Sequence, residues 1–87
     1  MQANKNLSVF NPWYAHRVDS CHNLYRWYAV WLTQDLFGDW ECWTAWGRIG
    51  RTSRQSKLRA RGSREYTESV AASLCQRKSR RGYRRID

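Results

Sequence analysis

The residues best suited to contact a ligand form the pentapeptide Trp46-Gly47-Arg48-Ile49-Gly50, which follows a predicted strand. A tryptophan ring offers a stacking surface, and an arginine offers a planar, permanently charged donor fork that matches phosphate. The two glycines let the backbone bend and let a ligand approach it closely. The pentapeptide alone leaves a second interpretation equally open, in which the tryptophan is a core residue and the arginine lies in an ordinary loop.

Catalytic motifs are absent from the sequence. It contains no phosphate-cradling glycine-rich loop, no Gly-x-Ser-x-Gly nucleophile turn and no His-Glu-x-x-His zinc motif. No nucleophile stands beside a general base, so we expect no enzymatic activity. His16, Cys21 and His22 lack a fourth ligand at a suitable spacing, and we therefore expect neither a metal ion nor another cofactor.

Positive charge is concentrated in the second half of the chain. The net charge of the 87 residues is +9, yet residues 1–46 carry three basic against four acidic side chains. Residues 47–87 carry thirteen basic against three acidic side chains, whereas all six tryptophans lie in the first part. This division predicts an aromatic scaffold whose positive surface meets a polyanion. The alternative is a basic, well-solvated protein without a particular ligand.

The chain is long enough for one small domain and too short for two. We expect residues 1–12 to form a flexible N-terminal arm and residues 13–87 to form the domain. The longest apolar run covers only residues 27–32, which predicts no membrane segment, and we expect a cytoplasmic protein. The three cysteines form no Cys-x-x-Cys pair, so free thiols in a reducing compartment are expected.

Aromatic and alternating residues in the first half predict strands. We expect a short strand over 13–18, a polar turn over 19–23, and a strongly aromatic strand over 23–33. A hairpin loop over 33–39 then leads into a strand over 40–46. Both faces of the aromatic strand are largely apolar, so it is expected either to be central in the sheet or to expose a second aromatic face to a helix, a partner or a base. One predicted face holds Tyr28, Val30 and Leu32, and the other holds Trp27, Ala29 and Trp31.

The second half predicts a loop, a strand and a helix. Gly47 and Gly50 end the preceding strand, residues 51–56 form a polar loop, and residues 57–61 alternate strictly. In that strand Leu58 and Ala60 are expected to point inward, so the row of outward cations is Lys57, Arg59 and Arg61. A helix is predicted over residues 64–80. Its predicted features are an N-cap at Ser63, an apolar stripe of Tyr66, Val70 and Leu74 widened by Ala71 and Cys75, and an end at Gly82. The predicted fold class is therefore α+β, a small antiparallel sheet with one C-terminal helix packed across it.

Taken together, these elements resemble a WGR domain, over about residues 14–85. The matching elements are Asn23, Trp27-Tyr28, Leu36-Phe37-Gly38 with Trp40, the pentapeptide 46–50, Leu58, Ser63 and the ending Lys78…Arg81-Gly82-Tyr83. Residues 16–19 also resemble the short strand that precedes the domain in stand-alone bacterial members. The resemblance implies an antiparallel sheet with one helix, and it implies nucleic-acid binding. In poly(ADP-ribose) polymerases this module helps to recognise DNA breaks.

The resemblance also implies residue roles. Trp46 would stack on a terminal sugar or base, and Arg48 would contact phosphate or a neighbouring domain. Stand-alone members often carry a Gly-Gln pair after the signature, and Arg54 occupies the position of that glycine here. We predict a non-catalytic module that binds DNA in preference to RNA, at ends or breaks, with weak sequence preference and no membrane partner. The predicted binding residues are Trp46, Gly47, Arg48, Arg51, Arg54, Lys57, Arg59, Arg61, Arg77, Lys78, Arg80, Arg81, Tyr83, Arg84 and Arg85.

A second functional hypothesis uses the aromatic face of the sheet instead. Trp27, Trp31 and Trp43 would then form a patch for a protein partner or for a second copy of the chain.

Overall fold

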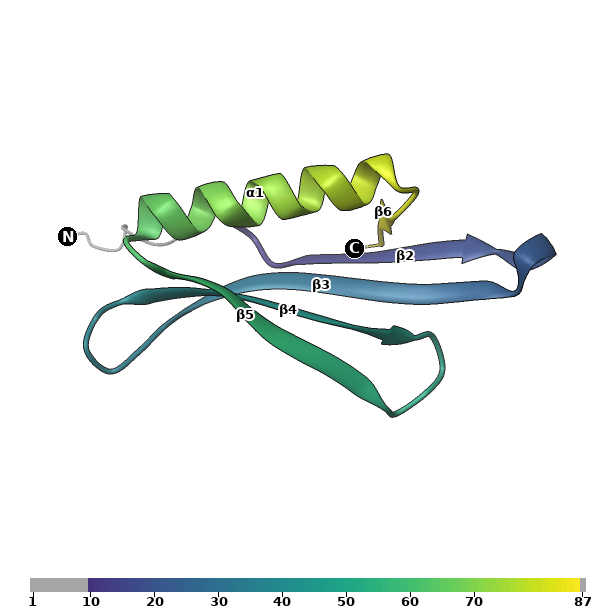
Figure 1. The fold of residues 1–87 in the computed structure, drawn as a ribbon, viewed down its shortest axis with the longest axis horizontal. Helices are drawn as coiled ribbons and strands as arrows, with labels where there is room; N and C mark the ends of the chain where they lie inside the picture. The colour runs from purple at the N-terminus through teal and green to yellow at the C-terminus, as the bar shows by residue number, and fades with distance from the viewer. Residues whose placement is uncertain (1–9, 87) are drawn as a thin grey trace.

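The computed structural model describes residues 10–86, and they form one sheet and one long helix (Figure 1). The predicted arm over residues 1–12 lies mostly outside the described residues. The strands pair in the antiparallel order β5-β4-β3-β2-β6, so β3 is central as predicted, and the α+β fold class is confirmed. The elements are β2 (Trp13–Asp19), the single 3-10 turn η1 (Ser20–His22), β3 (Leu24–Gln34), β4 (Trp40–Arg48), β5 (Arg54–Gly62), α1 (Arg64–Arg80) and β6 (Arg84–Arg85).

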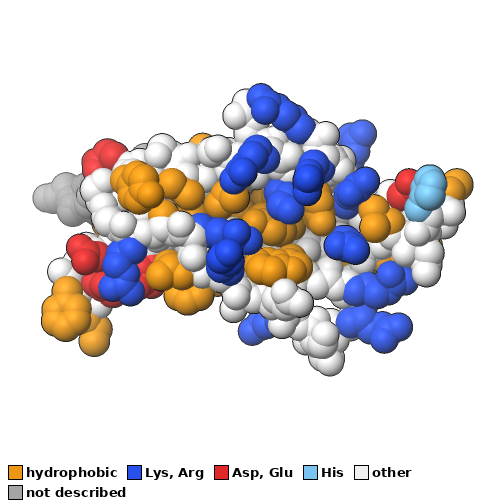
Figure 2. Space-filling model, in the orientation of Figure 1, with side chains coloured by type: hydrophobic (Ala, Val, Ile, Leu, Met, Phe, Trp, Pro, Cys, Tyr) orange, Lys and Arg blue, Asp and Glu red, His pale blue; other side chains and the backbone are white. Residues whose placement is uncertain are grey.

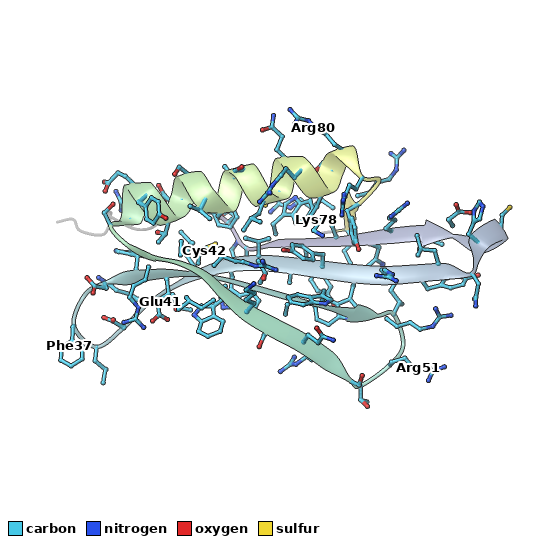
Figure 3. The ribbon with its side chains drawn as sticks, viewed as in Figure 1. Phe37, Glu41, Cys42, Arg51, Lys78 and Arg80 are labelled. Carbon is cyan, nitrogen blue, oxygen red and sulfur yellow. The ribbon has the colours of Figure 1, made fainter. Side chains whose placement is uncertain are left out.

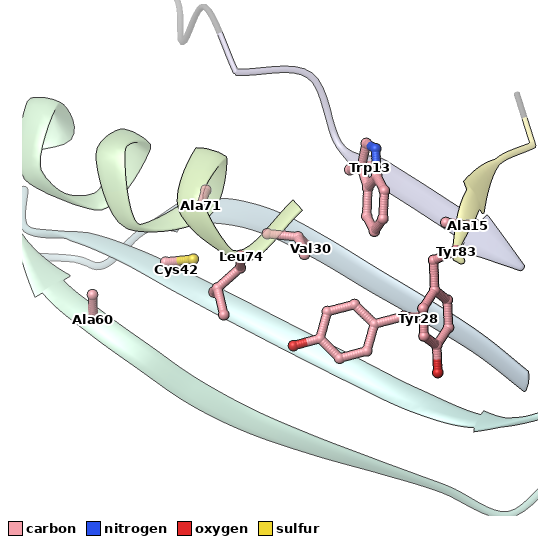
Figure 4. Close-up of a cluster of buried hydrophobic side chains, with 9 residues drawn as sticks. All are labelled: Trp13, Ala15, Tyr28, Val30, Cys42, Ala60, Ala71, Leu74 and Tyr83. Carbon is pink, nitrogen blue, oxygen red and sulfur yellow. The ribbon is translucent and has the colours of Figure 1, made fainter. Parts of the chain in front are cut away.

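The helix covers one face of the sheet and leaves the other face without a helix. On β3, Tyr28 and Val30 share one face, as the alternation predicted, and this is the face buried beneath α1. They pair across the sheet with Trp46 and Thr44 of β4, which lie on the same face. The cluster of buried apolar side chains is small (Figure 4), consisting of Trp13, Ala15, Tyr28, Val30, Cys42, Ala60, Ala71, Leu74 and Tyr83.

The limits of the helix follow the predicted local signals. The Ser63 hydroxyl accepts a hydrogen bond from the Tyr66 backbone N–H at 3.1 Å, which confirms the N-cap. At the other end Gly82 has φ +96°, its N–H donates to the Ser79 carbonyl at 3.0 Å, and the Tyr83 N–H donates to the Lys78 carbonyl at 3.1 Å. This paired-hydrogen-bond ending turns the chain back toward the sheet, where β6 pairs with β2.

The predicted apolar stripe of α1 is wrong at Tyr66. Its side chain is 53% exposed, whereas Thr67 is completely buried. Burial of this hydroxyl is possible because Thr67 Oγ1 donates to the carbonyls of Ser63 and Arg64, both at 3.0 Å, so the polar group is satisfied inside the helix.

The β4–β5 hairpin is longer than the sequence predicted. β4 continues through Gly47 to Arg48 and β5 begins at Arg54, so Gly47 does not end the strand and residues 54–56 belong to β5, whereas residues 51–53 are loop as expected. Glycine is tolerated in the strand because Trp27 of β3 lies directly across from Gly47 and covers it. Only residues 49–53 form the connecting loop.

The strict alternation predicted for residues 57–61 is also wrong, because β5 contains a bulge. Ala60 pairs with Cys42 on the helix side, whereas Leu58 pairs with Trp43 on the opposite side, and Arg59 is the extra residue between them. Arg59 Nε donates to Thr44 Oγ1 at 2.8 Å, which directs the guanidinium toward the helix side.

The predicted row of three cations is broken as a result. Arg61 pairs across the sheet with Glu41, on the face away from the helix, and forms ion pairs with Glu41 and Asp35. Arg59 and Arg61 therefore lie on opposite faces of the sheet.

Candidate nucleic-acid interface

A cleft lined by basic side chains runs between the C-terminal half of α1 and the strands beneath it (Figure 2). It consists of two adjoining hollows of about 510 and 420 Å³, which share Tyr28, Arg59 and Lys78. Among the residues that the structure describes, no aspartate or glutamate lines either hollow. We call this feature the basic cleft, and its cations are Arg26, Arg48, Arg59, Arg77, Lys78, Arg80 and Arg81.

Lys78 lies at the centre of the basic cleft and extends from α1 toward the sheet (Figure 3). Its Nζ lies 4.4 Å from the ring centroid of Tyr28 and 5.5 Å from that of Tyr83, so two aromatic faces support the charge. Burial lowers the pKa of Lys78, and repulsion from Arg81, Arg59, Arg77 and Arg26 lowers it further. The cations therefore converge around Lys78 without an acidic side chain among them. A bound anion would reduce the repulsion between these cations.

Trp46 lies at the floor of the basic cleft. Each of the two interpretations of this residue, a surface for a ligand and a core side chain, holds in part. The side chain is half-buried against the core and stacks on Tyr28, with ring centroids 6.2 Å apart and planes at 23°. It also lines the cleft, and the guanidinium carbon of Arg59 lies 5.5 Å from its ring centroid. The indole is thus partly accessible, and Arg59 covers part of its face.

Gly47 serves close packing rather than an open backbone. A Cβ at this position would lie 2.9 Å from Trp27 Nε1 and 3.1 Å from the Ser53 carbonyl oxygen. The side chain of Trp27 and the β4–β5 loop therefore occupy the space that we had expected a ligand to use.

Arg48 holds the turn that leads into β3. Its Nη1 donates to the Asn23 carbonyl at 3.3 Å and its Nη2 donates to Asn23 Oδ1 at 3.2 Å. Its guanidinium also lies over the Tyr25 ring, 5.2 Å from the centroid. Asn23 has φ +53°, and the arginine contacts this strained turn residue through both backbone and side chain.

The structure brings together nine of the fifteen residues that the sequence nominated for binding. Those that line the basic cleft are Trp46, Gly47, Arg48, Arg59, Arg77, Lys78, Arg80, Arg81 and Tyr83. Tyr83 is buried and supports the cleft from below. The other six are Arg51, Arg54, Lys57, Arg61, Arg84 and Arg85, so the expected binding set does not form one surface.

These six residues lie at several places on the fold. Arg51 and Arg54 border a groove on the opposite face of the sheet, and Arg61 is held in ion pairs. Lys57 is exposed on β5, outside the cleft. The remaining two arginines form β6, at the sheet edge beside β2.

Five residues that line the cleft were not among those nominated for binding, namely Arg26, Trp27, Tyr28, Gln55 and Leu74. A usable signal existed for Arg26, because a residue two positions before Tyr28 on a strand shares its face. Gln55 carried no signal, since it fell in the segment expected to be loop.

Among residues 10–86 there is no group of three or more potential metal-ligating side chains. In the same part of the chain, no helix has the length and apolarity needed to cross a bilayer.

An antiparallel sheet crossed by one helix, with a cleft of cations between them that no acidic side chain of the described residues lines, defines a small α+β module suited to binding anions. The WGR domain family model matches residues 12–87, and the chain therefore belongs to the WGR family. WGR domains are non-catalytic modules, and in poly(ADP-ribose) polymerases they bind nucleic acid. No curated protein and no solved structure matches the chain.

Proposed function

We propose that this protein is a non-catalytic DNA-binding module that holds ends or breaks in the basic cleft with little sequence specificity. The observation that carries the proposal is the convergence of seven cations on a cleft that no acid lines. Lys78 supports it most directly, because its lowered pKa reports both burial and repulsion from four arginines. A phosphate backbone supplies the negative charge that would remove this repulsion.

The chemistry of the cleft fits backbone contact better than base readout. Arginine and lysine dominate its lining, and Gln55 is its only amide side chain. Phosphate contacts position a protein on a duplex without reading its sequence. Membership in the WGR family favours DNA as the partner, and ends rather than continuous duplex.

Trp46 and Arg48 are assigned supporting roles at the terminus. The partly accessible indole would contact a terminal sugar or base, with Arg59 moving aside or bridging to the adjoining phosphate. Arg48 would contact phosphate with the guanidinium N–H groups that Asn23 does not accept.

Fluorescence-anisotropy titrations with blunt, nicked and covalently closed DNA test this proposal. With about five phosphates engaged, log affinity should fall against log salt with a slope of roughly −4 to −5. Trp46→Ala should weaken binding to blunt and nicked DNA more than binding to closed DNA. Equal losses on all three substrates would assign this tryptophan a structural role only.

A matched pair of lysine substitutions separates the basic cleft from general positive charge. Lys78→Met removes a cation from the centre of the cleft, whereas Lys57→Met removes the same charge from the helix-side face of β5, at a residue that does not line the cleft. Lys78→Met should bind ended DNA several-fold more weakly, and its slope of log affinity against log salt should be shallower by about one unit. Lys57→Met should have a smaller effect on both quantities. Equal effects of the two substitutions would contradict the assignment of the cleft, and salt-independent binding would contradict the whole proposal.

A further inference from the structure

The sheet face away from α1 carries a groove of about 670 Å³. Aromatic side chains from three strands border it, namely Tyr14 of β2, Trp27 and Trp31 of β3, and Trp43 of β4. The three tryptophans are half-buried and Tyr14 is 42% exposed, so part of each ring faces the groove. Most of this face is distinct from the basic cleft, which lies on the helix side, and Trp27 is the one described residue that lines both the groove and the cleft.

Residue size along the strands explains why the face is hollow. Ala29 and Ala45 pair directly in the middle of the sheet and form the floor. Trp31 and Trp43 pair with each other two residues away, and Trp27 lies two residues away in the other direction. At about 3.3 Å per residue, Trp27 and Trp31 are about 13 Å apart along β3, which leaves a trough between the Trp27 ring and the pair of Trp31 and Trp43. Tyr14, which pairs with Ala29, borders the trough on the β2 side.

The charges around the groove favour an anionic ligand. Arg51 and Arg54, from the β4–β5 loop and the start of β5, line it beside the Trp27 wall, and no acidic residue lines it. Both arginines are exposed. Near the other wall, Trp43 Nε1 already donates to Glu41 Oε1 at 2.9 Å, so the polar atom of that ring is satisfied and its π surface remains for contact.

We propose that this groove binds the bases of single-stranded nucleic acid, which stack on its tryptophan rings while the adjoining phosphates contact Arg51 and Arg54. Aromatic platforms next to arginines are the two components that single-strand sites combine, because every base has a π face and every link a phosphate. This proposal goes beyond the function assigned to the basic cleft, since it concerns another face and another state of the nucleic acid.

A pair of oligonucleotides with equal charge isolates the stacking contribution. Binding of oligo(dT) is compared with binding of an abasic oligonucleotide of the same length, using anisotropy and tryptophan fluorescence. Each stacked base should strengthen binding by about fivefold to a hundredfold or more, and oligo(dT) should quench the tryptophan emission. Equal affinities for the two oligonucleotides would overturn the proposal.

Two variants assign any preference for bases to the groove. Trp31→Leu should lower the ratio of oligo(dT) to abasic affinity at least fivefold while leaving binding to blunt duplex unchanged. Lys78→Met, in the basic cleft, should leave that ratio unchanged and weaken duplex binding. These opposite outcomes distinguish failure of the groove from failure of the cleft.

A further variant keeps the test decisive should the tryptophan substitution prevent folding. Arg54→Ala alters an exposed side chain and should weaken binding of both single strands without affecting blunt duplex. An unchanged single-strand affinity would count against the phosphate contact. A dimer in light scattering that Trp31→Leu dissociates would overturn the proposal in favour of a protein interface.

Discussion

Substitution of Gly47 by alanine tests whether this glycine of the family signature is required for packing. The added Cβ would lie 2.9 Å from Trp27 Nε1, 3.2 Å from Trp27 Cε2 and 3.1 Å from the Ser53 carbonyl oxygen. The distance of 2.9 Å between the added Cβ and Trp27 Nε1 is shorter than a nonbonded contact between carbon and nitrogen allows. Neither neighbour can move aside easily, because Trp27 Nε1 belongs to a fused ring and the Ser53 oxygen belongs to the backbone. Overpacking of this kind costs about 1–3 kcal/mol, and we expect a loss of about 2 kcal/mol in the free energy of unfolding.

The assay is thermal denaturation followed by circular dichroism, with urea titration as a second measure. For a domain of this size, about 2 kcal/mol corresponds to a fall in Tm of about 8–16 °C. Gly50→Ala is the matched control, because no atom lies within 4 Å of its added Cβ and only its φ of +83° opposes the change. The control should cost about 1–2 kcal/mol, through backbone strain alone.

A double substitution identifies the clash itself. Trp27→Leu removes the indole, so the added effect of Gly47→Ala should fall by about 1 kcal/mol or more in that background. A Gly47→Ala protein that melts within about 2 °C of the wild type would refute the packing argument. A penalty that is the same with and without the indole would place the clash elsewhere.

Three further predictions concern single side chains. Iodoacetamide should alkylate Cys21 first in the native protein, because this thiol is exposed, whereas burial raises the pKa of Cys42 and raises that of Cys75 to about 11. Mass spectrometry of a labelling time course checks this order. Labelling of Cys42 or Cys75 before Cys21 would contradict it. Ser63→Ala should destabilise the protein by about 1 kcal/mol through loss of the helix N-cap, measured by urea titration, while Ser63→Asp should retain most of the stability. The pKa of Lys78 is lower in the folded protein than in the unfolded chain, so the native state binds fewer protons between that pKa and 10.5, and stability attributable to this group should rise with pH in that window. Lys78→Met should remove this increment from the difference in urea midpoint between pH 7 and pH 10, and an unchanged increment would contradict a lowered pKa for Lys78.

Local patterns in the sequence were sufficient for the helix, for the existence of β2 to β5 and for most of their faces, but not for β6 or for the full lengths of β4 and β5. The helix over 64–80 followed from a capping serine and a terminal glycine, both of which act within one turn. The faces of β3 followed from its period of two, which fixes the direction of each side chain along a strand. The concentration of cations after residue 46 was likewise visible without any structure, and it indicated a polyanion as the partner.

Only the tertiary structure decided which cations act together. The bulge at Arg59 turns that residue to the helix side, and acids from a distant hairpin hold Arg61 on the other face. The turn at the end of α1 buries Tyr83 beneath Lys78, which neighbouring positions in the chain do not specify. Cross-strand register, bulges and ion pairs join residues far apart in sequence, and their energies depend on partners that no local pattern identifies. The sequence by itself therefore determined that the protein is a basic α+β module, and the packing of helix on sheet decided that its charge forms a cleft on one face and borders an aromatic groove on the other.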